Sequence, residues 1–144
     1  MSDSAGVPEG YEILQRTQGP GFAGLVGPFY ARRQGRELSL GLRIEQRHLN
    51  SRGSCHGGLL ATLADSAMGC AVLSTCAAGQ LFTTLELKLN FVRALLADSG
   101  LVRCEGTVLH RGGRIATAEA RALDAKGRLY AHATSTCMIL EAPR

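Results

Sequence analysis

The sequence has no tryptophan, and aromatic residues make up only 5% of its 144 residues. Proteins that bind nucleic acids commonly use clustered Lys and Arg or aromatic stacking platforms, and this chain has neither, although its net charge is +4. No apolar run is long enough to cross a membrane, and the N-terminal "MSDSAGVPEG" lacks the pattern of a secretory signal. We therefore expect no nucleic-acid partner, no membrane partner and a cytoplasmic location.

The cysteines follow neither a disulfide framework nor a metal-binding pattern. There are five, an odd number, and most lie within apolar stretches, which indicates buried thiols in a reducing compartment. His48, Cys55 and His56 are residue types that bind zinc, but no fourth ligand follows at a suitable spacing, so we expect no metal site. Cys55 next to His56 also suggests a Cys–His nucleophile, although sequence neighbours rarely have that geometry.

Hydrophobic periodicity predicts one strand, one long helix and then four strands. Residues 1–9 are typical of a loose tail and residues 11–18 of a short helix, so we expect residues 1–34 to precede the domain. Helical spacing predicts a helix over about 59–77. Alternating apolar residues predict strands over 37–49, 84–92, 100–110, 114–124 and 128–140. This order indicates an α+β domain, residues 35–141, in which an antiparallel sheet holds a single helix.

The two faces of the helix are predicted to differ. The face that would pack on the sheet consists of Leu60, Leu63, Ala64, Ala67, Met68 and Ala71. The opposite face consists of Gly58, Ala61, Thr62, Asp65, Ser66 and Gly69. Such small residues allow tight packing or the approach of a slim ligand, and the lone acid Asp65 favours a ligand. Alternation predicts that one strand has Leu85, Leu87, Leu89 and Phe91 on one face, and that another has Ala116, Ala118, Ala120 and Ala122 facing inward.

The start of the helix combines glycines with a distant carboxylate. Gly57 and Gly58 would expose backbone N–H groups at a helix N-terminus, where a phosphate or a developing oxyanion can bind. Asp65 lies eight residues further, about 12 Å along the helix axis, so one carbonyl group cannot contact both on the same helix. Two antiparallel copies of the helix would place Asp65 of one chain beside Gly57 of the other. We therefore expect an active site shared by the two chains of a homodimer.

The string "NSRGSCHGG", followed by "LAD", resembles the motif of the hotdog-fold acyl-CoA thioesterases of the PaaI and thioesterase superfamily member type. The likeness covers about residues 35–140 and includes "TTLELKLNFVR" and "HRGGRIATAEARALDAKGRLYAHAT". It implies a hotdog fold and hydrolysis of an acyl-CoA thioester to a carboxylic acid and free coenzyme A. It also implies no cofactor beyond the coenzyme A of the substrate, and dimers that pair into homotetramers. The chain departs from the family at Ala94, where the family usually has proline.

The resemblance also implies roles for individual residues. Asp65 would be the nucleophile or general base, the Gly57 N–H would be the oxyanion donor, and Asn50 would orient the thioester or the water. Thr84 would place a hydroxyl near the lytic water, while His56 would either hold the loop by hydrogen bonds or act as a base. The residues implied in binding coenzyme A are Phe91, Arg93, Arg111, Gly112 and Arg114.

Structural alternatives exist for these residues and for the function. Asp65 could be an interface or capping carboxylate, Asn50 a turn residue, and the hairpin arginines solvated charges. A non-catalytic module that binds acyl-CoA is the main alternative function. A hotdog dehydratase would need a histidine paired with the helix acid, and the helix has none. The acyl group stays open between aromatic groups, aryl-acetyl and hydroxyaromatic ones included, and medium-chain groups.

Overall fold

The computed structural model describes residues 6–35 and 37–143, so the first five residues of the expected tail lie outside the described residues. Its two helices are α1 (Phe22–Val26) and α2 (Gly57–Leu73), and three short 3-10 turns are η1 (Gln15–Thr17), η2 (Gln46–His48) and η3 (Ala97–Ser99). The strands are β1 (Glu12–Ile13), β2 (Tyr30–Gln34), β3 (Glu37–Arg43), β4 (Gln80–Phe91), β5 (Leu101–Arg111), β6 (Ile115–Leu123) and β7 (Leu129–Glu141).

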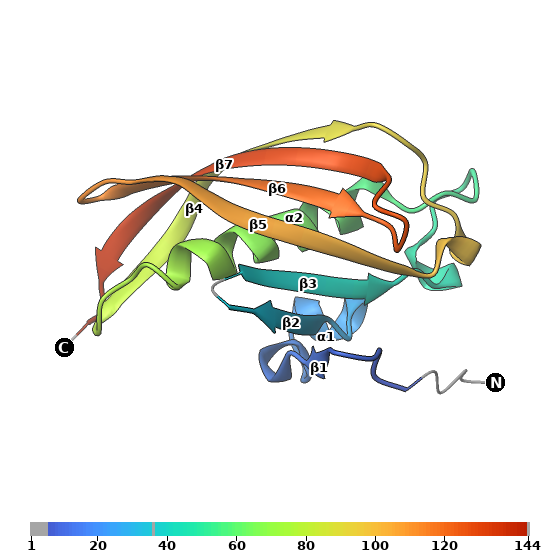
Figure 1. The fold of residues 1–144 in the computed structure, drawn as a ribbon, viewed down its shortest axis with the longest axis horizontal. Helices are drawn as coiled ribbons and strands as arrows, with labels where there is room; N and C mark the ends of the chain where they lie inside the picture. The colour runs from blue at the N-terminus through green and yellow to red at the C-terminus, as the bar shows by residue number, and fades with distance from the viewer. Residues whose placement is uncertain (1–5, 36, 144) are drawn as a thin grey trace.

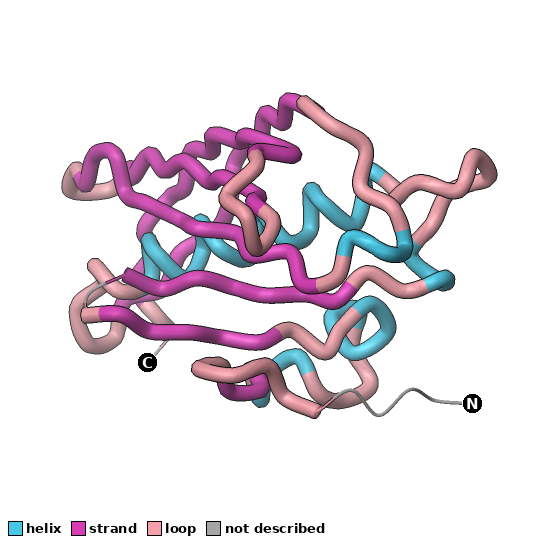
Figure 2. The backbone as a smooth tube through the Cα atoms, turned by 45° about the vertical axis from the view of Figure 1, so that its right-hand side comes forward, coloured by secondary structure: helices cyan, strands magenta, loops and turns pink. Residues whose placement is uncertain are grey.

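All seven strands form one antiparallel sheet in the order β1-β2-β3-β5-β6-β7-β4. The sheet curves around α2, which lies along its inner face (Figure 1). Figure 2 shows the same helix from another side, with β2 and β3 beneath it and the longer strands above. This arrangement confirms the predicted α+β hotdog fold. No helix of the described residues is long and apolar enough to span a membrane.

The core lies between α2 and the sheet, as the apolar pattern predicted. Leu63, Ala67 and Met68 of α2 are almost completely buried, and so are the four alternate alanines of β6, Ala116, Ala118, Ala120 and Ala122. Small side chains let the helix approach closely. At Gly106 of β5, a Cβ atom would lie 2.3 Å from the Ala67 carbonyl oxygen, so only glycine fits beneath the helix there.

The N-terminal region differs from the prediction of a helix over residues 11–18. Glu12 and Ile13 pair with Ala31 and Tyr30 of β2, so a strand and the turn η1 replace that helix. Strand β2, which the sequence pattern did not predict, pairs along its length with β3. Pairing with a strand distant in sequence therefore decides the backbone here, over a local helical pattern.

Helix α2 ends at Leu73, four residues before the predicted end. Its last turn is closed by hydroxyl groups, since the Ser74 and Thr75 side chains donate to the carbonyls of Ala71 and Val72 at 2.6 and 2.7 Å. Such side-chain hydrogen bonds compete with continuation of the helix.

Strand β4 contains an irregularity that changes its predicted faces. The register with β7 shifts between Thr84 and Glu86, and the extra residue, Leu85, is 52% exposed. The prediction that Leu85 shares a face with Leu87 and Leu89 is therefore wrong, because a β-bulge changes the direction of the side chains on either side of it. Leu87 and Leu89 pack against the core, whereas Phe91, predicted on the same face, is 60% exposed at the end of the strand.

Candidate active site

Asp65 lies on the outer face of α2, where β4 passes beside it. Its Oδ1 accepts a hydrogen bond from the Thr84 hydroxyl at 2.9 Å, so the structure brings these two predicted residues together. Thr84 is positioned by the bulge that follows it, and the Cys137 thiol lies 4.0 Å behind its hydroxyl. Within residues 6–35 and 37–143, no partner is found for Asp65 Oδ2. This oxygen can therefore accept a proton or approach a carbonyl carbon.

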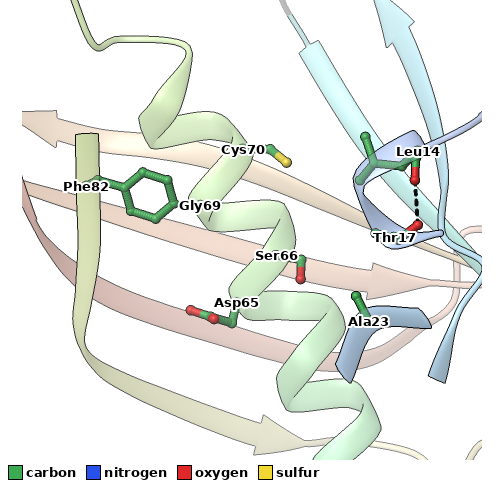
Figure 3. A pocket seen from close by; sticks show the side chains of 8 residues that line it. All are labelled: Leu14, Thr17, Ala23, Asp65, Ser66, Gly69, Cys70 and Phe82. Carbon is green, nitrogen blue, oxygen red and sulfur yellow. Dashed lines mark hydrogen bonds between the residues drawn. The ribbon is translucent and has the colours of Figure 1, made fainter. Parts of the chain in front are cut away.

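A cavity of about 260 Å³, here named the Asp65 cavity, opens beside this carboxylate. Its lining residues are Leu14, Thr17, Ala23, Asp65, Ser66, Gly69, Cys70 and Phe82 (Figure 3). The Phe82 ring lies on Gly69, where a Cβ atom would be only 2.7 Å from the ring. The face of α2 with small residues thus lines the open cavity and also provides, at Gly69, the space that the Phe82 ring occupies.

Sequence reasoning missed the N-terminal wall of this cavity. Ala23 belongs to α1, which the loop before α2 holds in place: Arg47 donates hydrogen bonds to the carbonyls of Leu25 and Gly27, and His48 Nε2 lies 2.9 Å from the Val26 carbonyl oxygen. Burial lowers the pKa of His48, although its bond to Val26 opposes this effect. The neutral ring also accepts the Glu45 N–H at Nδ1, at 3.0 Å. No local pattern in residues 14–23 signals these contacts.

The second group of predicted residues surrounds the N-terminus of α2. His56 caps this helix, because its Nδ1 accepts the Gly58 N–H at 2.9 Å. This hydrogen bond is of the kind expected for the first of its two predicted roles, which is to hold the loop. The Gly57 N–H has no hydrogen-bond partner in the described part of the chain, and the Phe91 ring lies over Gly57. Gly57 therefore presents a free donor at the positive end of α2.

Asn50 stabilises the turn that leads to this helix. Its Oδ1 accepts the N–H groups of Arg52 and Ser54 at 2.9 and 3.3 Å, while its Nδ2 donates to the Ser54 hydroxyl at 3.1 Å. Asn50 also lines a cavity of about 420 Å³, here named the Gly57 cavity. The other lining residues are Arg52, Ser54, Cys55, Gly57, Leu60, Phe91, Val92, Arg93, Ala94 and Leu95. The loop that contains Ala94 is held at the next residue, Leu95, whose carbonyl accepts the Cys55 N–H at 2.7 Å.

Cys55 is unsuited to the alternative role of a nucleophile. Burial raises the pKa of its thiol to about 11, so the reactive thiolate is scarce at neutral pH. No cluster of three His, Cys, Asp or Glu side chains suited to a metal ion occurs within residues 6–35 and 37–143.

The structure divides the predicted catalytic residues into two groups. Asn50, His56 and Gly57 surround the start of α2. Asp65 lies two turns further along this helix, beside Thr84 of β4. The Gly57 cavity and the Asp65 cavity share no residue. A single chain therefore does not bring the predicted oxyanion donor and the predicted carboxylate to one point.

The residues predicted to bind coenzyme A are divided in the same way. Phe91 and Arg93 lie at the end of β4, next to Gly57, and the Arg93 guanidinium lies 5.9 Å from the centre of the Tyr130 ring. Arg111 is the last residue of β5, near the other end of β4, and its guanidinium donates to Thr75 and Gln80 at 3.1 and 3.2 Å. The β5–β6 turn follows it. Gly112 and Arg114 belong to the same turn. Arg52, which sequence reasoning passed over, lines the Gly57 cavity beside Arg93.

Comparison with known proteins shows the family of the chain. The family model described as Thioesterase superfamily matches residues 52–131. A Pseudomonas aeruginosa protein with the provisional name esterase PA0474 is 37% identical over 129 residues, which span 89% of this chain and 93% of that protein.

Solved structures share the fold and part of the sequence. A phenylacetic acid degradation-related protein from Ralstonia eutropha JMP134 is 29% identical, with a TM-score of 0.72 over 85% of this chain and 94% of that one. The BH2602 protein from Bacillus halodurans, whose structure was solved with CoA, is 27% identical, with a TM-score of 0.67 over 71% of this chain and 66% of that one.

Proposed function

This chain belongs to the thioesterase superfamily and is a thioester hydrolase, and we propose that it hydrolyses acyl-CoA at sites formed between two copies. The observation that carries the proposal is the division of the site. One part offers an uncommitted N–H donor at Gly57, and the other offers the uncommitted Oδ2 of Asp65. A thioester hydrolase needs both chemistries around one carbonyl group, and only a second copy can supply the missing one.

The free edge of β4 supports pairing of two copies. Strand β4 is the last strand of the sheet, and its outer edge pairs with no strand among the described residues. An unpaired edge of twelve residues is suited to antiparallel pairing with its own copy about a two-fold axis. The Phe91 ring lies over Gly57, and the Thr84 hydroxyl is bonded to Asp65. We therefore infer a register in which Phe91 lies opposite Thr84 of the partner subunit, because this register brings Gly57 of one protomer towards Asp65 of the other.

This register also brings together the residues inferred to bind coenzyme A. In this register the C-terminal end of β4 in one protomer lies beside the N-terminal end of β4 in its partner. At that N-terminal end, Gln80 accepts a hydrogen bond from Arg111. Arg93 of one protomer then lies near the turn that carries Arg114 in its partner. Guanidinium groups at this edge suit the phosphates of coenzyme A, and the CoA-bound relative from Bacillus halodurans supports that ligand.

The proposed reaction follows from these positions. The Gly57 N–H of one protomer polarises the thioester carbonyl, while Thr84 holds Asp65 of the other protomer through Oδ1. The free Oδ2 either removes a proton from water, which attacks the carbonyl carbon, or attacks that carbon itself. Collapse of the tetrahedral adduct releases coenzyme A as the thiolate, which takes up a proton. Water hydrolyses the acyl-enzyme in the second case.

The test is a thiol-release assay on an acyl-CoA panel, with wild type beside Asp65→Asn. We expect the substitution to lower kcat on the order of 10³-fold, because it removes the base or nucleophile and preserves shape. Asp98→Asn, at an exposed acid in η3, is the matched control and should keep full activity. Full turnover by a folded Asp65→Asn protein would contradict this mechanism. Binding of acyl-CoA without release of thiol by the wild type would support the non-catalytic module instead.

A further inference from the structure

A second cavity continues the Asp65 cavity along α2. It has a volume of about 530 Å³ and is here named the β1 cavity. Its lining residues are Glu12, Ile13, Leu14, Gln15, Ala31, Arg33, Leu38, Cys70, Leu73 and Ser74. Leu14 and Cys70 line both cavities, so the two adjoin at these side chains. Together they extend along α2 from Asp65 to the end of the helix and cross it from the side of Asp65 to the side of Cys70 (Figure 3).

The distribution of charge indicates which part of an acyl-CoA would lie here. None of the residues that line the Asp65 cavity is basic, and the single basic residue of the β1 cavity, Arg33, is exposed at its rim, as is Glu12. The Gly57 cavity, by contrast, carries Arg52 and Arg93. Coenzyme A phosphates favour the side with the arginines, because charge-assisted hydrogen bonds form there. The acyl group is left with the Asp65 and β1 cavities, whose one basic lining residue is the exposed Arg33; Arg111, which donates to Thr75 just beyond α2, lines neither of them.

The lining of the β1 cavity is suited to an alkyl chain. Ile13, Leu14 and Leu38 are half-buried, and Leu73 is 38% exposed although it belongs to the core helix. Covering these apolar side chains with methylene groups would remove further apolar surface from water, at about 0.8 kcal/mol per buried CH₂. An aryl group beside Asp65 would leave this surface uncovered.

The length of the path sets the size of the acyl group. Cys70 lies five residues beyond Asp65, about 7.5 Å along the helix axis, and Leu73 lies eight residues beyond it, about 12 Å. An extended alkyl chain advances roughly 1.25 Å per carbon. The advance along the axis alone therefore takes about ten carbons to reach Leu73, and a chain of four carbons ends well before it.

We propose that the Asp65 cavity and the β1 cavity form one acyl channel, which makes unbranched acyl-CoA of about ten carbons or more the preferred substrate. The proposal rests on the proposed function and names the substrate class of the same site. Leu73 is a specificity-determining residue in it, because it contacts only acyl chains long enough to enter the β1 cavity. Phe82, seated on Gly69, closes the channel on the side of β4.

The test compares decanoyl-CoA with butanoyl-CoA in wild type and in Leu73→Asp. A carboxylate at this position would be desolvated only by the longer chain. We expect the ratio of kcat/KM for decanoyl-CoA to that for butanoyl-CoA to fall at least about tenfold. Leu109→Asp replaces a leucine of β5 that is 56% exposed and lines neither cavity, and it should leave the ratio unchanged. Leu73→Gln, a milder change, provides the same comparison if Leu73→Asp does not fold.

Calorimetric binding to the Asp65→Asn protein separates this proposal from the proposed function. Tighter binding of decanoyl-CoA than of butanoyl-CoA, lost on addition of Leu73→Asp, supports the channel even if no thioester is hydrolysed. An unchanged ratio in both Leu73 variants, with active and folded enzyme, would overturn the channel while leaving thioester hydrolysis in place.

Discussion

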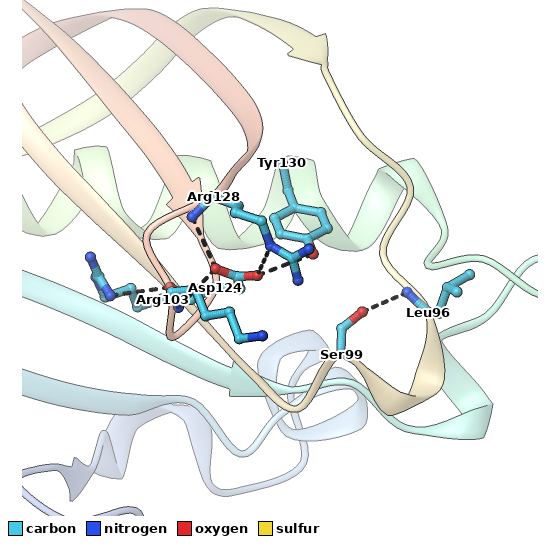
Figure 4. A network of polar contacts seen from close by, with 7 residues as sticks. Leu96, Ser99, Arg103, Asp124, Arg128 and Tyr130 are labelled. Carbon is cyan, nitrogen blue, oxygen red and sulfur yellow. Dashed lines mark hydrogen bonds and ion pairs between the residues drawn. The ribbon is translucent and has the colours of Figure 1, made fainter.

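Asp65 and Asp124 are both carboxylates within the fold, yet they differ in how many hydrogen bonds they accept from the chain. Asp124 lies in the turn between β6 and β7, where Oδ1 accepts the N–H groups of Lys126 and Arg128, both at 2.9 Å (Figure 4). Its Oδ2 accepts from Arg128 Nε at 2.7 Å and from the Tyr130 hydroxyl at 3.3 Å. Asp65 receives one hydrogen bond, from Thr84.

The difference separates a structural acid from a reactive one. Burial raises the pKa of Asp124, but the hydrogen bonds from Arg128 and Lys126 outweigh it and lower that pKa to about 2. A carboxylate whose lone pairs are all occupied neither takes a proton from water nor attacks a carbonyl. Asp65 has one carboxylate oxygen without a hydrogen bond from the described residues, and it lines a cavity. That oxygen is therefore available for a reaction.

The sharpest way to break this comparison is to replace each acid by its amide. Asp65→Asn should abolish nearly all turnover, on the order of 10³-fold, while its melting temperature stays close to that of wild type, because one hydroxyl contact is at stake. Asp124→Asn should keep its turnover when folded and should melt several degrees lower, because the amide cannot accept all four hydrogen bonds. Thermal melts and thiol release on both variants check the pair. A stable but inactive Asp124→Asn protein would reverse the two assignments.

A smaller effect is expected at Thr84, which holds Asp65. Thr84→Val keeps the shape of the side chain and removes the hydrogen bond to Oδ1, so Asp65 is less well oriented. We expect kcat to fall on the order of tenfold, with Thr84→Ser restoring much of it. Thr83→Val, at the exposed neighbour on the other face of β4, is the control. Equal activity of wild type and Thr84→Val would show that the hydroxyl does not orient the carboxylate.

The smallest effect is expected in the acid stability of the β6–β7 turn. Because the folded pKa of Asp124 lies below its ordinary value of 3.8, the unfolded chain binds more protons as the pH falls. The stabilisation from Asp124 is therefore complete above about pH 4 and is lost as the pH falls towards 2. Urea unfolding of wild type and Asp124→Asn should give free energies that differ at pH 6 and converge in that window. A constant difference down to pH 2 would contradict the structural role of this acid.

Periodicity and spacing predicted much of the fold. The alanines of β6 and the apolar face of α2 repeat regularly, and the spacing of eight residues from Gly57 to Asp65 led to the prediction of a site shared by two chains. The role of Thr84 followed only from the family resemblance, and its hydrogen bond to Asp65 depends on a bulge that strand alternation does not reveal. The seat of Phe82 on Gly69 and the N-terminal cavity wall join segments far apart in sequence, so no local pattern contains them.

Complementation between two inactive variants tests the shared site most directly. Gly57 is the first residue of α2, and His56 before it has φ −63° and ψ 132°, a backbone that tolerates a following proline. Gly57→Pro therefore removes the N–H donor while keeping the backbone of the helix start, although its Cβ atom must displace the exposed Phe91 ring, which lies 2.7 Å away. Gly57→Ala displaces the same ring but keeps the N–H, so it is the control for that displacement. The second variant is Asp65→Asn. Each should be inactive alone.

The two proteins are unfolded together, refolded as a mixture and assayed by thiol release. A mixed dimer joins the intact Gly57 of one chain to the intact Asp65 of the other. Half of the dimers are then mixed with one working site each, so we predict recovery of about a quarter of wild-type turnover. A mixture that forms mixed dimers and stays as inactive as its two components would contradict a site shared between chains.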